Sequence, residues 1–473
     1  MPDPNRWKAL AIVCAAFFMT VLDVSIVNVA LPSIGSSLHF SEANLQWVIT
    51  AYAITFGGFL LLGGRSADLL GRRRMFYVGV TVFTIASFLC GLAWSEGVLI
   101  GARALQGLGA AIISPAALSI IMTSFDEGAE RNKALGIWGA IGGSGAAVGV
   151  LAGGLLTKYL GWEWIFFVNV PVGAAALVLA PRFVRESRVD RPSTPDVAGA
   201  VTITAGLALL VYGVSQAPAH GWGSGWTISR LIVAAVLLGA FAVIETRAKD
   251  PLMPFRIFRV RTVAGANVAG LLLGAVVFAN FFLLTLFVQQ VLHWSALKTG
   301  LTFIATAGTA VLWAGLAQAL VTRIGARAVM SAGFVGMIAG LLWYTQIPVD
   351  ASYWGDLLPG YLLVGFALPF TFIPVSIAAL AGVEQHEAGL ASGLINTAQQ
   401  VGGAIGVAVT SSVLLTHTNT LVKSGAPFAS AFTSGASWAF WVCVGIAVAG
   451  LVAAVVLIRD AELAPVEEAA ATA

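Results

Sequence analysis

The sequence predicts an all-α integral membrane protein in which two six-helix halves and two inserted helices together give fourteen transmembrane helices. Three observations support this fold class. Of the 473 residues, 58% are hydrophobic and only 10% are charged, whereas an average soluble domain is about one quarter charged. The mean hydropathy is +0.90, and one glycine pattern occurs twice along the chain. So much apolar surface exceeds what one water-soluble core can bury.

Fourteen apolar runs are long enough to be spans, because a helix needs roughly 20 residues to cross a hydrocarbon core of about 30 Å. We expect the spans at residues 8–31, 44–64, 75–95, 97–121, 133–156, 164–181, 197–216, 229–245, 262–288, 298–320, 327–346, 356–380, 389–414 and 436–458. With a cytoplasmic N-terminus, twenty of the 25 Lys and Arg residues lie inside, four lie outside and one lies within a span. This bias predicts that both termini are cytoplasmic.

An internal repeat predicts how the spans are organised. Residues 136–149 and residues 393–406 both read G-x8-G-x3-G, at an offset of 257 residues. Glycines four apart let membrane helices pack closely, although the match could also arise by chance among 53 glycines. If the repeat is real, the domains are an N-terminal half at 1–181, linkers with an inserted helix pair at 182–261, and a C-terminal half at 262–473. Duplicated halves around a central site are a transporter design.

Asp23 and Arg103 are the unambiguous ionisable acid and base within the predicted spans. At 1.5 Å per residue, they lie roughly 13 Å and roughly 9 Å below the same membrane edge. A charge at mid-bilayer costs on the order of 3 kcal/mol or more, and we expect the two to offset one another across a shared polar cavity. Burial disfavours a charged carboxylate and a nearby arginine favours it, so Asp23 is predicted to bind and release the coupling proton. The alternative is a static ion pair that fixes helix packing.

Several motifs carry a resemblance to a known family. The stretch "GRSADLLGRRR" at 64–74 resembles the G-x-x-x-D-x-x-G-R-[RK]-[RK] signature of the major facilitator superfamily. Residues 99–111 resemble the arginine motif of the superfamily's fourth span. Residues 22–32, 164–173 and 396–408 resemble motifs of its fourteen-spanner drug:proton antiporters. The resemblance covers nearly the whole chain and implies the major facilitator fold, with transport by rocking of the two halves.

The resemblance also implies roles for individual residues. It assigns a cytoplasmic gate to Gly64, Asp68, Gly71 and Arg72. Asp126 or Glu127, at the cytoplasmic end of the fourth predicted span, is expected to pair with Arg72 in this gate. It assigns a helix-packing motif to Gly145, Gly149, Gly153 and Gly154, in which Val150 stands where the antiporters have Pro. That substitution leaves antiport and symport both open.

A broad apolar substrate path with few hydrogen-bonding groups is expected. The candidates are polar side chains within the spans or matched motifs, namely Asn28, Gln106, Asn169, Asn280, Asn396 and Gln399. Amides in membrane helices also serve as contacts between helices, and each candidate has that alternative.

The sequence lacks a G-x-x-x-x-G-K-[ST] nucleotide loop and a metal-spaced His/Cys cluster. We therefore expect no enzyme activity, no metal, no nucleic-acid partner and no cofactor other than protons as the coupling ion. The leading hypothesis is a monomeric exporter of lipophilic small molecules in the bacterial inner membrane, driven by the proton-motive force. A proton-coupled symporter that imports a metabolite, and a membrane sensor that transports nothing, are the alternatives.

Overall fold

The computed structural model describes residues 5–125, 129–187, 196–248, 251–253, 255–380 and 388–459, and helices make up the regular structure of these residues. The N-terminal part contains α1 (Arg6–Ser37), α2 (Glu42–Leu45), α3 (Trp47–Leu70), α4 (Arg72–Gly91), α5 (Glu96–Ser124), α6 (Ala129–Tyr159), α7 (Trp164–Phe167) and α8 (Asn169–Phe183). The middle part contains α9 (Val197–His220), α10 (Gly225–Arg247) and the short η1 (Phe255–Arg259). The C-terminal part contains α11 (Arg261–Gln290), α12 (Ala296–Thr302), α13 (Ile304–Ile324), α14 (Ala326–Tyr344), η2 (Tyr353–Leu357), α15 (Leu358–Ala378), α16 (Ala388–Lys423) and α17 (Phe428–Leu457).

A helix lies at every position where the sequence predicts a span. Within the described residues, twelve segments are long and apolar enough to cross a membrane. The predicted spans at 44–64 and 133–156 correspond to α3 and α6, whose described apolar stretches are shorter, at Trp47–Leu60 and Val148–Tyr159. The structure therefore supports about twelve apolar spans, and the count of fourteen stays a prediction.

The offset of 257 residues relates the two halves helix by helix. Shifting α1 by 257 gives 263–294, which overlaps α11, and shifting α6 gives 386–416, which overlaps α16. The same shift carries α5 to 353–381, the combined range of η2 and α15 within a few residues. The glycine repeat is therefore part of a correspondence that extends over both halves.

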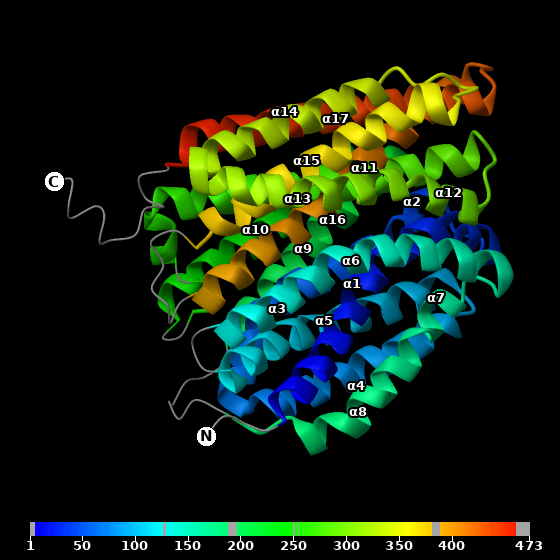
Figure 1. Cartoon of the computed structure of the whole chain (residues 1–473). Helices are drawn as coiled ribbons and strands as arrows, with labels where there is room; N and C mark the ends of the chain where they lie inside the picture. Colours follow the sequence, from blue (N-terminus) through cyan, green and yellow to red (C-terminus); the bar gives the residue numbers. More distant parts are fainter. Residues whose placement is uncertain are drawn as a thin grey trace.

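The two halves lie one above the other, with the helices of both running in roughly the same direction (Figure 1). The start of α1 and the end of α17 lie at the same end of the bundle, which we call the termini end; the opposite end is the far end. At the far end, Gln289 of α11 donates a hydrogen bond to the carbonyl of Val29 on α1 (2.9 Å). A Cβ placed on Gly154 of α6 would lie 2.9 Å from the Cα of Leu297 on α12. The halves are therefore in close contact at the far end.

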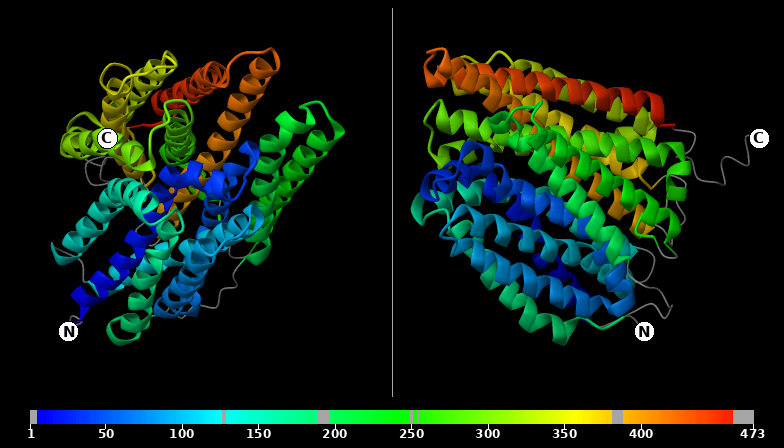
Figure 2. Two further views of the ribbon diagram at one scale, coloured as in Figure 1. Left: turned by 90° about the vertical axis from the view of Figure 1, so that its right-hand side faces the viewer. Right: turned by 180° about the vertical axis from the view of Figure 1, so that it is seen from behind.

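The inserted pair α9–α10 stands to one side of both halves (Figure 2). Its helix α9 packs into the seam between the halves, where an apolar cluster joins three helices. The cluster consists of Ala53 and Ile54 of α3, Leu207 and Val211 of α9, and Ala404 and Ala408 of α16. Gln216 of α9 also donates a hydrogen bond to Asn44 at the far end (2.7 Å). The helix α9 therefore touches both halves along the same side of the bundle.

Candidate functional site

Asp23 is the centre of a polar cluster inside the N-terminal half. Arg103 of α5 forms an ion pair with Asp23 of α1, with 2.5 Å between Nη1 and Oδ2. Gln106 and Asn169 each donate a hydrogen bond to the other carboxylate oxygen, at 2.7 Å and 3.2 Å. The side chains of Asp23 and Arg103 are 0% and 1% exposed. Helices α1, α5 and α8 therefore meet at one desolvated carboxylate, which accepts three hydrogen bonds.

The guanidinium of Arg103 is held by several groups besides Asp23. Its Nε donates to the carbonyl of Val48 on α3 (2.7 Å), and its Nη1 donates to Gln106 (2.5 Å). The ring of Tyr52 lies 4.4 Å from the Cζ of Arg103, and the ring of Phe166 lies 5.7 Å away. Aromatic faces stabilise a cation most strongly where water is excluded. The arginine is thus a fixed positive charge in an otherwise apolar interior.

Gln106 uses its whole hydrogen-bonding capacity within this cluster. Its amide nitrogen donates to Asp23 and to the hydroxyl of Ser87 on α4 (2.8 Å). Its oxygen accepts from Arg103 and from the thiol of Cys90 (3.7 Å). An amide has two donor hydrogens and two acceptor lone pairs, so every group is matched. Such a fully connected network fixes the positions of its members.

The structure changes the interpretation of two predicted residues and of the cavity. Gln106 and Asn169 were expected on the substrate path, but both are buried and bonded to Asp23, so they belong to the carboxylate's immediate surroundings. The expectation that Asp23 and Arg103 face a shared polar cavity is wrong for this conformation, because both side chains are sealed from solvent. The pairing of the two charges is present as predicted.

Sequence reasoning missed Ser87 and Cys90 and did not anticipate the carbonyl of Val48. Both side chains lie in α4 and are 0% exposed. A serine in the apolar run 75–95 was the one available signal, and serine in a membrane helix is too common to be diagnostic. Gln106 had a clearer signal, because it lies three residues after Arg103 and therefore on the same face of the helix.

The remaining substrate-path candidates are dispersed. Asn28 donates to the carbonyl of Val24 within α1 (2.9 Å), and Asn280 of α11 is buried with an unpartnered Oδ1. On α16, Asn396 is exposed and Gln399 is half-buried. These four residues lie on three different helices, α1, α11 and α16.

The predicted packing glycines allow α6 to approach two other helices. Cβ atoms on Gly145 and Gly153 would lie 2.9 Å from Val21 and 2.6 Å from the carbonyl of Ile26, both on α1. One on Gly149 would overlap Ser25, and one on Gly154 would meet α12 of the other half. Three of the glycines therefore pack within the N-terminal half, and the fourth belongs to the contact between the halves.

The predicted gate residues lie at the termini end, where α3 gives way to α4. Gly71 adopts φ 107°, a conformation that favours glycine, and a Cβ there would lie 2.7 Å from the carboxylate of Glu186. That carboxylate accepts hydrogen bonds from the first backbone amides of α4, those of Arg73 (3.0 Å) and Arg74 (3.1 Å). An acid at a helix N-terminus stabilises the helix. Glu186 thus joins the end of α8 to the start of α4.

Other gate positions are only partly described. A Cβ on Gly64 would lie 3.3 Å from Pro115 of α5, and the amide of Arg72 donates to the carbonyl of Ser187 (2.9 Å). Asp68 lies in α3, but its side chain is outside the described part of the structure, and Asp126 lies outside the described residues altogether.

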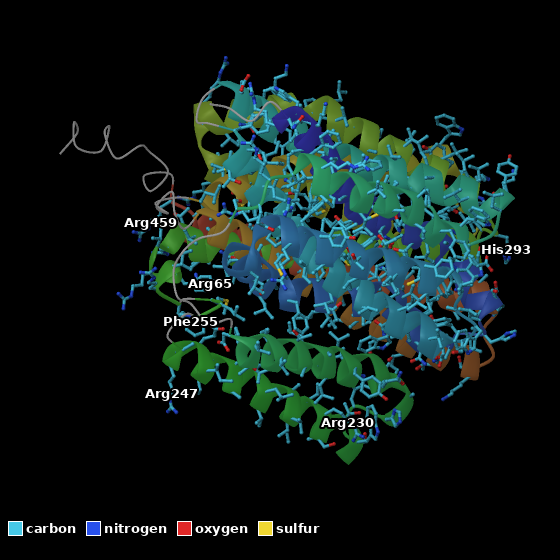
Figure 3. The ribbon with its side chains drawn as sticks, turned by 90° about the horizontal axis from the view of Figure 1, so that it is seen from below. Arg65, Arg230, Arg247, Phe255, His293 and Arg459 are labelled. Atoms are coloured by element: carbon cyan, nitrogen blue, oxygen red, sulfur yellow. The ribbon has the colours of Figure 1, made fainter. Side chains whose placement is uncertain are left out.

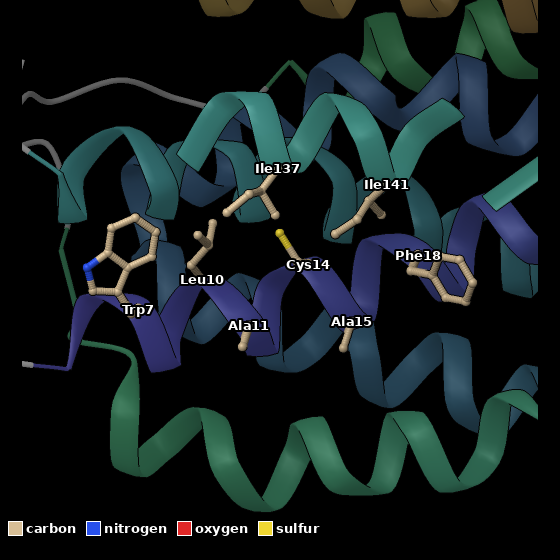
Figure 4. A pocket seen from close by; sticks show the side chains of 8 residues that line it. All are labelled: Trp7, Leu10, Ala11, Cys14, Ala15, Phe18, Ile137 and Ile141. Carbon is tan, nitrogen blue, oxygen red and sulfur yellow. The ribbon is translucent and has the colours of Figure 1, made fainter. Parts of the chain in front are cut away.

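An apolar groove of about 410 Å³ lies between α1 and α6 towards the termini end (Figure 4). It is lined by Trp7, Leu10, Ala11, Cys14, Ala15, Phe18, Ile137 and Ile141. Ile137 and Ile141 point from α6 towards α1, and Phe18 lies at the end of the groove opposite Trp7. Phe18 precedes Asp23 by five residues, about 7.5 Å along the helix. A lipophilic surface therefore leads along α1 towards the polar cluster.

Residues 13–407 match the model of one family, the Major Facilitator Superfamily. The chain belongs to the Major Facilitator Superfamily. It is accordingly a multi-pass membrane transporter and not an enzyme. The Spinster homologue, a bacterial relative of a human lysosomal transporter solved in an inward-facing and unoccupied conformation, matches this superfamily member with a TM-score of 0.70. That comparison covers 97% of this chain and 98% of the other at 16% identity, so it shows the fold alone.

Curated members of the superfamily include antibiotic resistance and export proteins that resemble this chain over most of its length. The puromycin resistance protein of Streptomyces alboniger is 40% identical, over 96% of this chain and 91% of its own length. The cephamycin export protein CmcT of Amycolatopsis lactamdurans is 41% identical, over 94% of this chain and 91% of its own length. The tetracenomycin C resistance and export protein of Streptomyces glaucescens is 32% identical, over 85% of this chain and 75% of its own length.

Proposed function

We propose that this transporter exports lipophilic antibiotics or related small molecules across a bacterial inner membrane in exchange for protons. In this proposal the chain is a monomer with fourteen spans, and the termini end is cytoplasmic. Two observations support export. The relatives named above are resistance and export proteins, and the groove along α1 is lined by apolar side chains. The Asp23 cluster supports proton coupling and is the observation that carries the proposal.

Proton binding at Asp23 is expected to force a rearrangement because of the groups around it. The carboxylate contacts Arg103, Gln106 and Asn169, and all three are donors. A protonated carboxyl carries a hydrogen that needs an acceptor, and none of these three contacts supplies one. Loading a proton must therefore displace at least one donor. A buried polar group left without a partner costs roughly 1–3 kcal/mol, enough to favour a different packing of the helices.

Arg103 completes this coupling mechanism. An arginine stays protonated in proteins, so its charge is constant while that of Asp23 changes. With Asp23 ionised, the pair is neutral overall, and α1, α5 and α8 are held together. With Asp23 protonated, an uncompensated positive charge remains in the interior, and we propose that this state favours opening of the cluster to one side of the membrane.

The proton-motive force is large enough for this task. Moving one charge through 100 mV yields about 2.3 kcal/mol. Because about 1.4 kcal/mol corresponds to a tenfold ratio of concentrations, one proton can sustain a substrate gradient of about fortyfold.

The contacts between halves support an inward-facing conformation. Gln289 bonds to Val29 at the far end, and backbones approach closely between α6 and α12. There, a Cβ on Gly300 would lie 2.7 Å from the carbonyl of Val150. We infer that the far end is the outer gate and that it is closed here. Outward opening would then have to separate these same contacts.

Transport into everted membrane vesicles tests this function. Energised vesicles that contain the wild-type protein are expected to take up ethidium or puromycin and to release protons as they do so. Asp23→Asn, which keeps the size of the side chain but cannot ionise, should abolish both signals. Glu130→Gln is the matched control, because Glu130 is an exposed carboxylate that forms its ion pair with Arg6 (3.0 Å).

Three results would contradict parts of the proposal. Equal proton-coupled transport by Asp23→Asn would place coupling elsewhere and leave Asp23 as a structural partner of Arg103. Substrate and protons moving in the same direction would indicate the symport that Val150 leaves open. The absence of movement for a panel of lipophilic antibiotics, in vesicles with verified insertion, would argue against export.

A further inference from the structure

The inserted helix pair carries a second buried carboxylate. Glu245 lies near the termini end of α10 and is 3% exposed, although the neighbouring Arg247 is exposed. Figure 3 shows the α9–α10 hairpin at the edge of the molecule, with Arg247 and Phe255 at one end and Arg230 at the other. A buried acid at the end of a peripheral hairpin needs a physical reason, because a carboxylate is rarely buried without a partner.

One oxygen of Glu245 holds the segment that leads into the C-terminal half. Its Oε2 accepts a hydrogen bond from the backbone amide of Met253 (2.9 Å), and the backbone of Leu252 bonds to the same carboxylate. Residues 251–253 precede η1 and α11, the first long helix of that half. Glu245 therefore clamps the end of the hairpin to the linker.

The other oxygen of Glu245 faces a second unpartnered acid oxygen. Asp196 caps the start of α9 by accepting from the amide of Gly199 through Oδ1 (2.7 Å). Its Oδ2 and the Oε1 of Glu245 are both buried without a hydrogen-bond partner. A Cβ on Gly199 would lie 2.6 Å from the Oδ2 of Asp196 and 2.8 Å from the Oε1 of Glu245. The two oxygens are therefore no more than 5.4 Å apart.

Two ionised carboxylates at this separation repel one another, and burial increases the cost. A single proton on either oxygen removes one of the two charges and so relieves the repulsion, as in the carboxyl dyads of acid–base enzymes. We propose that Asp196 and Glu245 bind one proton between them, forming a proton-binding site in the inserted hairpin that is separate from Asp23. The pair, and neither residue alone, then defines the titration.

Few other charges act on this pair in the described structure. Asp196 is the charged group recorded as acting on Glu245. Arg247 is exposed at the end of α10, and Arg256 and Arg259 are exposed on η1. Lys249 and Asp250 lie outside the described residues. Water screens exposed charges strongly, so these arginines offset little of the repulsion between the two carboxyl groups.

The proposed site makes the clamp sensitive to pH. While the proton is bound, Glu245 accepts from the linker and shares the proton with Asp196, and the clamp is closed. As pH rises through the point at which the pair releases its proton, a second negative charge appears and the two acids repel. The clamp is therefore strongest at low pH and weakens as pH rises.

Hydrogen–deuterium exchange of the purified full chain measures the clamp without a transport substrate. After correction for intrinsic exchange rates, protection of the Leu252 and Met253 amides is expected to fall about tenfold between mildly acidic and alkaline pH, the effect of losing one charge-assisted bond. Glu245→Gln keeps an acceptor but no charge, and Asp196→Asn keeps the helix cap but removes the repulsion. Both variants should be protected at all pH values, whereas Glu130→Gln should behave as wild type.

Infrared spectroscopy then detects the proton directly. In an Asp23→Asn background, the C=O band of a protonated carboxyl should be present at neutral pH and disappear in Glu245→Gln. Absence of that band, or protection that does not change with pH in wild type, would overturn the proposal. Amide protection of Leu252 and Met253 that changes with sodium concentration at constant ionic strength would also overturn the proposal. That result would show that a metal cation, and not a proton, occupies the site.

Discussion

Removing Gln106 is the sharpest test of the polar cluster, because this amide bonds to four of its members, Asp23, Ser87, Cys90 and Arg103. The substitution Gln106→Leu keeps most of the volume and removes all of the hydrogen bonds. Two of these bonds join charged groups, Asp23 (2.7 Å) and Arg103 (2.5 Å). A hydrogen bond to a charged group contributes about 1.5–3 kcal/mol, so the two together predict a loss of about 3–6 kcal/mol of stability.

The matched control for this experiment is Gln216→Leu. Gln216 is half-buried and donates one hydrogen bond to a neutral partner, Asn44 (2.7 Å). A neutral bond contributes about 0.5–1.5 kcal/mol. Thermal unfolding in detergent, followed by tryptophan fluorescence, should therefore show a several-fold larger effect for Gln106→Leu than for the control. Equal effects would refute the reasoning that this buried network, as described, holds α1, α4 and α5 together.

Three further predictions concern helix packing, the contact between the halves at the far end, and the termini end. Gly149→Val should prevent correct folding, because even a Cβ at this position overlaps a serine of α1. The control Gly101→Val has open space around the new side chain and should express normally. Size-exclusion profiles of the two variants measure the difference. Gln289→Leu removes the bond to Val29 and should raise the outward-open population about fivefold, as for a loss of about 1 kcal/mol, measured by labelling of cysteines placed at the far end. Glu186→Ala should lower stability by about 0.5–2 kcal/mol through loss of the cap on α4, measured by thermal unfolding.

Hydropathy was sufficient to predict an all-helical membrane protein with many spans, because the bilayer imposes a minimum length on every span of a polytopic chain. The count of fourteen and the orientation stay predictions. Hydropathy also predicted that Asp23 pairs with Arg103, because two opposite charges at similar depth in the membrane each lower the cost of burying the other. It could not show on which side of each helix an amide lies once the helices pack. Asn169 was therefore placed on the substrate path, although α8 turns it towards Asp23 (3.2 Å).

The inserted pair was the least predictable part of the chain. Asp196 and Glu245 lie 49 positions apart in sequence, one at a helix start and one at a helix end, where acids are ordinary. Only the antiparallel packing of α9 and α10 around Gly199 places their oxygens together. Long-range pairing of this kind leaves no local signal in the residues that take part.

The offset between the halves suggests why, among the residues that the structure describes, the ionic cluster around Asp23 has no counterpart in the C-terminal half. Asp23 corresponds to Asn280, Arg103 to Gly360 and Ser87 to Tyr344, each 257 residues further along. In the C-terminal half the ring of Tyr344 packs directly against Gly360, in the place that corresponds to the arginine. The duplicated fold thus keeps its geometry while an aromatic side chain replaces the charged one. In the proposed mechanism, a titrating cluster in each half would impose two proton-dependent packings, whereas a neutral asparagine at the position that corresponds to Asp23 leaves the paired halves with one.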